Sequence, residues 1–188
     1  MARVPQIDYT RAKEEAREAH DQHQRETGRI TNMKRTLLQS VPAFHALMEW
    51  YPLRDAVRPF LGDRLTTIFA HAVSSENECL ICDTFFRRIL VDAGENPDEL
   101  ALNEIEREVV AYGRALAHSP HRVPDEVWAP LAKRYSHEQL VALTAFGALM
   151  IATNVINNAL EVPLDGYLEP YRKGATTPRS DARSAGSP

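Results

Sequence analysis

The two cysteines of this chain, Cys79 and Cys82, are three residues apart and form a C-x-x-C motif. On a helix, residues at this spacing lie on one face, about 5–6 Å apart, within reach of a disulfide bond. Such a pair can be oxidised and reduced without refolding the chain, and we interpret it as redox-active. Two alternatives stay open from the residues alone: half of a metal site, for which the sequence offers no second ligand pair, and two inert core thiols.

The residues around the motif predict its place on a helix. Ser75 and Glu78 have the spacing of a capping box, so we expect a helix to begin there and to carry both thiols in its first two turns. The helix dipole favours a thiolate at that end. Glu76, Glu78 and Asp83 act in the opposite direction, because nearby negative charge disfavours a second anion. These opposing effects leave the direction of the thiol pKa shift open.

The composition is that of one globular domain. The chain has 188 residues, 44% of them hydrophobic and 26% charged, enough for a sizeable core. Its net charge of −4 is spread over interspersed acidic and basic residues, so we expect neither nucleic acid nor a membrane as a partner. The first residues form no apolar leader, and no apolar stretch reaches the roughly 18 residues that span a bilayer. We therefore expect a cytoplasmic protein, in which thiols at this spacing are working groups.

Helical periodicity accounts for most of the chain. Apolar residues over 61–73 recur at helical spacing and lead into the cysteine stretch. Two further capping boxes, Asn103 with Glu106 and Ser136 with Gln139, predict the starts of two later helices. The sequence has no long strand alternation, no glycine-rich nucleotide motif and no internal repeat. The fold class is therefore predicted to be all-α, with about seven helices.

Three parts are expected along the chain: an N-terminal helical arm over 1–29, a helical core domain over 30–170 and a disordered tail over 171–188. The arm is rich in Ala, Glu and Arg and has little to bury, so it is either a surface helix or packs on a neighbouring subunit. His20 and His23 in this arm are expected to be exposed. The tail has no apolar periodicity and is rich in small and polar residues.

The last long helix is apolar on nearly every side from Leu140 to Ala152, which predicts a helix buried in the middle of the domain. At about 14 residues it is expected to be too short to cross a membrane. It ends in Asn154, Asn157 and Asn158, which share one face. Because buried amides need partners, we interpret them as a structural hydrogen-bond network, with a pocket lining as the alternative.

Several of these stretches resemble one known family. They are Gly28-Arg29-Ile30-Thr31-Asn32-Met33-x-Arg35-Thr36-Leu37 with Ser40-Val41-Pro42, Leu65 to Gly94 with Asn77-Glu78-Cys79-x-x-Cys82, and Ala145 to Leu164. Over 30–165 the chain resembles the carboxymuconolactone decarboxylase and AhpD-like alkylhydroperoxidase superfamily. The resemblance implies an AhpD-like all-α fold and assembly as a homo-oligomer. It also implies a C-x-x-C pair that reduces small hydroperoxides or relays electrons from an external thiol reductant, with no bound cofactor or metal.

The resemblance further implies roles for the two cysteines. Cys82 is the attacking thiol, and Cys79 resolves the product into a disulfide. Hydroperoxidase members of the family add a glutamate twelve residues before the first cysteine and a histidine four residues after the second, which together move protons. Thr67 and Phe86 occupy those positions here, so both proton carriers are absent.

His71 and Glu78 are candidates to replace the missing carriers. His71 lies two helical turns before Cys79, and a histidine that titrates near neutral pH suits acid–base catalysis. Glu78 directly precedes the thiol. Each has a structural alternative, as a residue on a helix flank for His71 and as a capping group for Glu78. The candidate catalytic residues are therefore Cys82, Cys79, His71 and Glu78.

Three functions of different classes follow from these observations. The leading hypothesis is a thiol-dependent oxidoreductase of the alkylhydroperoxidase type, which the retained cysteines favour. A cofactor-free carboxymuconolactone decarboxylase-like lyase acting on a small cyclic acid would not need the thiols. A non-catalytic oligomeric redox sensor would form the disulfide without turnover, and the missing proton carriers favour it.

Overall fold

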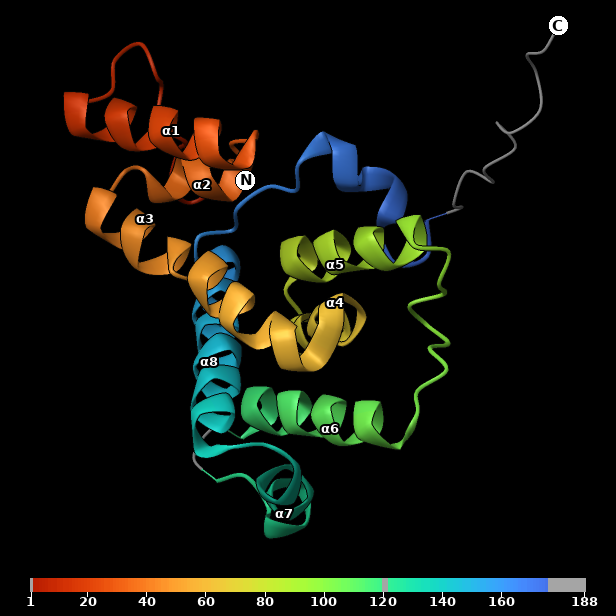
Figure 1. Cartoon of the computed structure of the whole chain (residues 1–188). Helices are drawn as coiled ribbons and strands as arrows, with labels where there is room; N and C mark the ends of the chain where they lie inside the picture. Colours follow the sequence, from red (N-terminus) through yellow and green to blue (C-terminus); the bar gives the residue numbers. More distant parts are fainter. Residues whose placement is uncertain (1, 120–121, 176–188) are drawn as a thin grey trace, which may run out of the picture.

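The computed structural model describes residues 2–119 and 122–175; residues 176–188 of the predicted tail lie outside this range. The described residues form eight α-helices, one 3-10 helix and no strand, which confirms the all-α prediction with one helix more than the seven expected. The elements are α1 (Glu14–Thr27), α2 (Asn32–Leu37), α3 (Val41–Met48), α4 (Trp50–Glu76), α5 (Leu80–Asp92), α6 (Glu104–His118), α7 (Asp125–Arg134), α8 (His137–Ala159) and η1 (Gly166–Tyr171) (Figure 1).

Helix α4 is the centre of the arrangement. Its second half runs between α5 on one side and α6 on the other, and α8 packs along their ends (Figure 1). Helices α1, α2 and α3 form a layer at one end of the molecule, and α7 lies at the opposite end. The two capping boxes predicted for α6 and α8 are both present, each with its two reciprocal hydrogen bonds.

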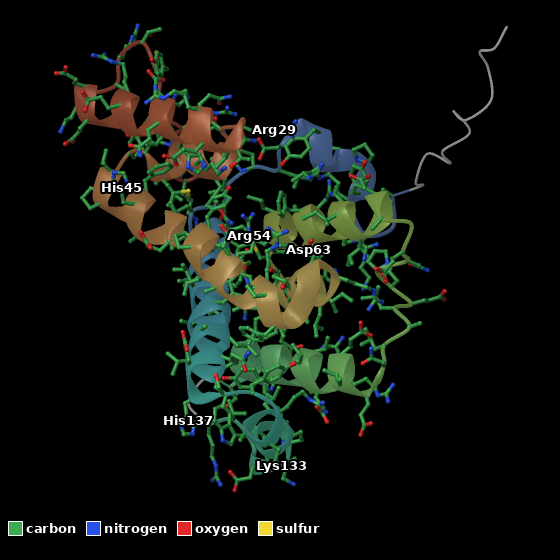
Figure 2. The ribbon with its side chains drawn as sticks, viewed as in Figure 1. Arg29, His45, Arg54, Asp63, Lys133 and His137 are labelled. Atoms are coloured by element: carbon green, nitrogen blue, oxygen red, sulfur yellow. The ribbon has the colours of Figure 1, made fainter. Side chains whose placement is uncertain are left out.

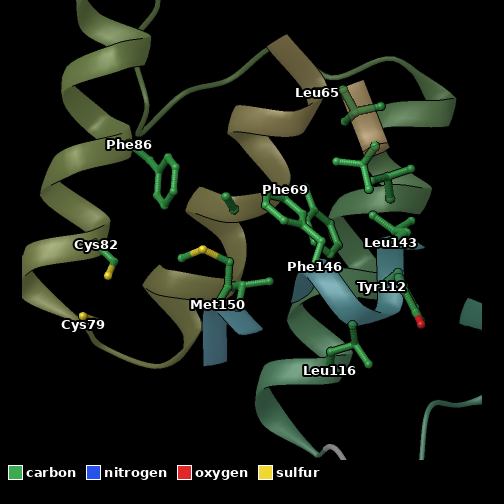
Figure 3. Close-up of a cluster of buried hydrophobic side chains, with 14 of the residues drawn as sticks. Leu65, Phe69, Cys79, Cys82, Phe86, Tyr112, Leu116, Leu143, Phe146 and Met150 are labelled. Atoms are coloured by element: carbon green, nitrogen blue, oxygen red, sulfur yellow. The ribbon is translucent and has the colours of Figure 1, made fainter. Parts of the chain in front are cut away.

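Three stacked aromatic rings join the central helices. Phe69 of α4 stacks on Phe146 of α8, with ring centroids 5.9 Å apart, and on Tyr112 of α6 at 6.5 Å (Figure 3). The backbones can approach this closely because Gly113 and Gly147 present no side chain to the Phe69 ring. The same core continues to the two cysteines, so the C-x-x-C motif lies in the wall of the main core.

A bend in α4 divides it into two segments with different surroundings. Gly62 has φ 76°, a left-handed conformation that favours glycine, and Pro59 precedes it by three residues. Trp50 and Tyr51 at the start of the first segment border the α2 and α3 layer, and Val57 further along that segment joins the second segment in the main core.

Helix α1 packs on α3 through one apolar face. Ala19 and His23 are buried there, in contact with the cluster around Phe44. The prediction that His23 is exposed is wrong: the residue is 4% exposed, because its ring fits between Phe44 and Tyr51. Burial without a partner for Nε2 within the described chain lowers the pKa of His23 to about 4, so the ring is neutral at pH 7. His20 is half-buried beside Asp21.

Helix α8 is 23 residues long, so the prediction of about 14 residues is wrong. The helix includes the polar residues at both ends of the apolar stretch, because a capping box starts it and buried amides continue it. Among the described residues, α8 is the one helix whose length and apolar composition would be sufficient to cross a membrane. Its inner face instead packs on α4 and α6 and carries buried Asn154 and Asn157.

The short helix η1 returns the chain to the surface of α5. Leu168 is 1% exposed, and Nε of Arg87 donates to the carbonyl oxygen of Tyr171 at 3.3 Å. The Tyr171 hydroxyl donates to Asp92 at 2.9 Å. The chain is therefore docked up to residue 171, where the predicted tail begins.

Gly147→Ala should destabilise the protein. A Cβ at this position would lie 2.9 Å from Cδ1 of Leu116 and 3.0 Å from Cζ of Phe69. We expect the overpacking to cost about 1–3 kcal/mol, more than the roughly 1 kcal/mol that alanine gains over glycine in a helix. Thermal melting measures the difference. Gly166→Ala is the matched control, since its Cβ would meet nothing within 4 Å; equal melting temperatures for both variants would contradict the close packing of α8.

Candidate dithiol site

A tight turn between α4 and α5 positions the first cysteine. Helix α4 continues through Ser75 to Glu76, and α5 begins at Leu80 with Cys79 as its N-cap. Glu78 lies in the turn at φ 51°, exposed to solvent, and the Cys79 amide donates to the carbonyl of Ser74 at 3.0 Å. The predicted Ser75–Glu78 capping box is therefore wrong, because the preceding helix includes the serine.

The two thiols form a hydrogen-bonded pair at the start of α5, seen at the edge of the core in Figure 3. The hydrogen bond from the Cys82 thiol lowers the pKa of Cys79 against the effect of burial, and backbone N–H groups of the first turn act in the same direction. The same bond, together with burial and the charges of Cys79 and Asp83, raises the pKa of Cys82 well above its usual value. When the pair loses one proton, the negative charge belongs on Cys79, and the proton stays on Cys82.

Asn157 of α8 contacts both sulfur atoms. Its Nδ2 lies 3.4 Å from Sγ of Cys82, 3.8 Å from Sγ of Cys79 and 3.4 Å from Sδ of Met33. The amide favours the thiolate form of both cysteines. Asn157 is thus part of the site. Sequence analysis gave such a role for the asparagines only as the alternative to a structural network. The signal in the sequence was the row of asparagines at the end of an apolar helix.

The neighbouring asparagines hold the turn in place. Asn154 donates to the side-chain oxygen of Asn77 at 3.2 Å, and Asn158 donates to the Asn77 backbone carbonyl at 3.0 Å. Asn77 in turn donates to the carbonyl of Ala117 in α6. The predicted hydrogen-bond network is therefore present, and it fixes the turn that carries Cys79.

Cys82 also lines a small cavity of about 100 Å³, which Cys79 does not reach. The wall is mostly apolar and includes Met33, Trp50, Phe85, Phe86, Met150 and Leu168. Nε1 of Trp50 donates to Sδ of Met150, which fixes one side of the wall. The cavity is thus an apolar chamber, formed by α2, α3, α4, α5, α8 and the segment at η1, with a thiol in its lining.

Three ionisable groups at the cavity wall stand out against the apolar lining. Lys34 is 6% exposed, and burial lowers its pKa to about 8. Its Nζ donates to the Tyr51 hydroxyl at 2.9 Å and to the Arg29 carbonyl at 3.2 Å. Burial raises the pKa of Tyr51 and of Asp165, whose carboxylate accepts from the Asn32 amide at 3.0 Å. Sequence analysis missed Lys34, because nothing in its local pattern predicts burial.

The structure places His71 away from the dithiol. Its Nε2 approaches Asp83 to 3.1 Å without hydrogen-bond alignment, and the ring lines a separate cavity of about 340 Å³ with Arg87 and Asp98. Thr67 and Phe86, at the two relay positions, both border a third cavity of about 300 Å³. Of the four candidate catalytic residues, the two cysteines lie together, whereas His71 and Glu78 face other surroundings.

The described part of the chain brings no three His, Cys, Asp or Glu side chains together in a group that could hold a metal ion. The cavity lining is mostly apolar and sulfur-bearing, and among the described residues its charged groups are the Lys34 ammonium and the Asp165 carboxylate. The arrangement suits thiol chemistry on a small uncharged molecule.

Asn157→Leu should raise the pKa of Cys79, because it removes an N–H donor that stabilises the thiolate. The ultraviolet absorbance of the thiolate, followed against pH, measures this change. The Oδ1 atom of Asn157 has no partner within the described chain, so the fold should tolerate leucine. An unchanged titration in Asn157→Leu would show that the amide does not act on the thiolate.

Comparisons with known proteins support the fold. No family model and no curated protein matches the sequence. Among solved structures, the AhpD-core, uncharacterized peroxidase-related protein from Ralstonia eutropha JMP134 has a TM-score of 0.70 at 17% identity, covering 89% of this chain and 94% of that one. The debrominase Bmp8 has a TM-score of 0.71 at 20% identity, covering 88% and 93%.

A cysteine-to-alanine variant of Bmp8 in complex with 2,3,4-tribromopyrrole is equally similar, with a TM-score of 0.71. All three structures share the order and packing of the helices over most of their length. At these identities the likeness concerns the fold. The chain therefore has the AhpD-like all-α fold that its sequence predicts.

Proposed function

We propose that the protein is a thiol-dependent oxidoreductase that reduces a small, largely apolar substrate through Cys82 and Cys79. The observation that carries this proposal is the different placement of the two thiols. Cys82 lines the apolar cavity, whereas Cys79 is 0% exposed and lies behind it, hydrogen-bonded to Cys82. A substrate in the cavity meets one sulfur and leaves the other free to resolve the product.

The placement of the two thiols supports a particular order of events. The pKa of Cys79 is lowered and that of Cys82 is raised, so a single negative charge on the pair is favoured on Cys79, which does not reach the cavity; in the proposed order Cys79 then acts as the base that takes the Cys82 proton. The Cys82 thiolate then attacks the outer oxygen of a hydroperoxide; an S–O bond forms, the O–O bond breaks, and an alkoxide leaves and takes up a proton.

The second step closes the disulfide. The Cys79 sulfur gives up its proton and attacks the sulfenic acid on Cys82, so that an S–S bond forms and water leaves. The sulfurs must close from hydrogen-bond contact to the roughly 2.05 Å of a disulfide, a small movement at a helix N-terminus. An external thiol then restores both cysteines, and the balance is one hydroperoxide and two thiols converted to an alcohol, water and a disulfide.

A halogenated aromatic ring is a second candidate substrate for the same pair. The similar fold of a debrominase that binds a tribromopyrrole, and the aromatic lining of this cavity, favour it. The Cys82 thiolate would take the halogen as a sulfenyl halide while the ring carbon takes a proton. Attack by Cys79 would then release halide and form the disulfide.

Cys82→Ser should abolish turnover with either substrate, because the cavity then holds no thiol. Cys79→Ser lacks both the base and the resolving thiol, so it should react once, more slowly than the parent, and should trap a sulfenic acid on Cys82 that a dimedone-type probe labels. Peroxide or bromopyrrole consumption with dithiothreitol as reductant measures turnover, and mass spectrometry locates the label. If the double serine variant matches the parent, the thiol mechanism is wrong and the lyase hypothesis is favoured. If the disulfide cycles without consumption of substrate, the sensor hypothesis is favoured.

We also propose that the protein self-associates through the outer face of α8. Val141 is 69% exposed and Val155 57%, and Trp128 of α7 borders the same apolar hollow as Val141. Contiguous apolar surface of this kind is typical of an interface between subunits.

Light scattering at micromolar concentration should therefore show at least a dimer of the 21.2 kDa chain. Val141→Glu should shift the protein toward the monomer, because a carboxylate would have to be buried in the interface. Lys133→Glu, on an exposed position of α7, is the control. A parent protein that is monomeric at all concentrations tested would contradict this assembly.

A further inference from the structure

Lys34 is a buried ammonium group without a close carboxylate. Among the described residues its Nζ has the Tyr51 hydroxyl and the Arg29 carbonyl as hydrogen-bond partners and no ion-pair partner, and Asp165 influences it through longer-range attraction. Keeping a cation in an apolar wall opposes folding unless it is paired. A group retained under these conditions beside a reactive thiol is a candidate for a functional role.

The hydrogen bonds of Lys34 leave donors for a ligand. An ammonium has three N–H groups, and within the described chain two of them bind the Tyr51 hydroxyl and the Arg29 carbonyl. Tyr51 accepts from Lys34, so its own O–H is also available. Both residues line the cavity that Cys82 lines. One N–H and one O–H can therefore donate to a molecule held there.

Helix α2 connects this lysine to the sulfur pair. Met33, the neighbour of Lys34, places its Sδ 3.4 Å from Nδ2 of Asn157, which lies 3.4 Å from Sγ of Cys82. The lysine and the thiol therefore belong to the walls of one small chamber of about 100 Å³. A substrate that fills the chamber contacts walls that include both residues.

The proposed reduction of a hydroperoxide by Cys82 needs a proton inside the cavity. Attack on an alkyl hydroperoxide releases an alkoxide, a strong base, and neither Thr67 nor Phe86 can protonate it. We propose that Lys34, held by Tyr51, donates the proton to the departing alkoxide. This inference rests on the proposed function.

The balance of the step is complete. The Cys82 sulfur supplies the electron pair for the S–O bond, the O–O electrons leave with the alkoxide, and an N–H proton of Lys34 converts the alkoxide to an alcohol. Lys34 is left neutral and regains its proton from solvent before the next turnover. With a pKa near 8, the group is charged at neutral pH and still a competent acid.

The test compares two oxidants whose leaving groups differ in their need for a proton. tert-Butyl hydroperoxide releases a basic alkoxide, whereas peracetic acid releases acetate, which leaves without protonation. Both are small, and rapid mixing with tryptophan fluorescence follows the oxidation of Cys82, since Trp50 lines the cavity. Lys34→Met should slow the reaction with tert-butyl hydroperoxide by about 10²-fold or more and should leave the rate with peracetic acid within a few-fold of the parent.

Two further variants make the comparison specific. Tyr51→Phe keeps the ring and removes the hydroxyl that holds Lys34, so it should show the same selective loss to a smaller extent. Lys133→Met removes an exposed lysine on α7, at the opposite end of the molecule from Arg29, and should behave as the parent (Figure 2). Alkylation of Cys82 by iodoacetamide, whose leaving iodide needs no proton, should proceed at the parent rate in Lys34→Met if the fold and the thiol are intact.

Equal slowing with both oxidants, or no slowing with either, would overturn the role of Lys34. A loss of iodoacetamide reactivity in parallel with the oxidation rates would also overturn it, because Lys34 would then act on the thiol itself. The Cys82→Ser variant separates this outcome from a failure of the proposed function. If that variant reacts with tert-butyl hydroperoxide as fast as the parent, the thiol mechanism fails and the inference fails with it.

Discussion

The anchoring of one turn by the asparagines of α8 is the constraint on which the site depends. Asn154 and Asn158 bind Asn77 in the turn between α4 and α5. This turn makes Cys79 the N-cap of α5, where the backbone N–H groups of the first turn stabilise a thiolate. Without these hydrogen bonds to Asn77, the side-chain amides of Asn154 and Asn158 would lose their partners inside the protein. The Cys79 sulfur would also lose its position at the N-terminus of α5.

The two cysteines differ both in pKa and in their access to the cavity, and the proposed chemistry depends on this difference. The more acidic sulfur is enclosed, and the accessible sulfur holds the shared proton. In the proposed reaction, the enclosed Cys79 sulfur is therefore kept from oxidants that diffuse past the protein, whereas a molecule that fills the cavity meets the Cys82 thiol. Apolar walls and a single buried cation favour uncharged or weakly acidic ligands over highly charged ones.

The sequence was sufficient for the fold class because the local signals were strong. The capping boxes of α6 and α8, the glycine that ends α1 and the apolar periodicity of α4 each act over a few residues. The same kind of signal misled at Ser75 and Glu78, since a capping box requires the preceding chain to be non-helical, and α4 reaches Glu76. Burial of His23 and Lys34 depends on distant partners, which no local pattern encodes.

The candidate site was predictable only in part for the same reason. The spacing of the two cysteines was sufficient to predict the C-x-x-C pair. Asn157, which contacts both sulfurs, lies 75 positions after Cys82 in the chain, and no local pattern connects the two. His71 has a suitable side chain at a suitable helical spacing, yet it faces Asp83 on another side of α4. Proximity within a helix did not decide which groups share the cavity; packing between helices did.

The different exposure of the two sulfurs also gives the protein two internal probes of its own motion. Cys79 is 0% exposed, so a reagent can reach it only when the α4–α5 turn separates from α8. Cys82 responds to any opening of the chamber, including fluctuations of η1, which contributes Leu168 to the wall. Labelling rates at the two cysteines thus report on separate events. The rate at Cys79 reports the separation of the α4–α5 turn from α8, and the rate at Cys82 reports the opening of the cavity.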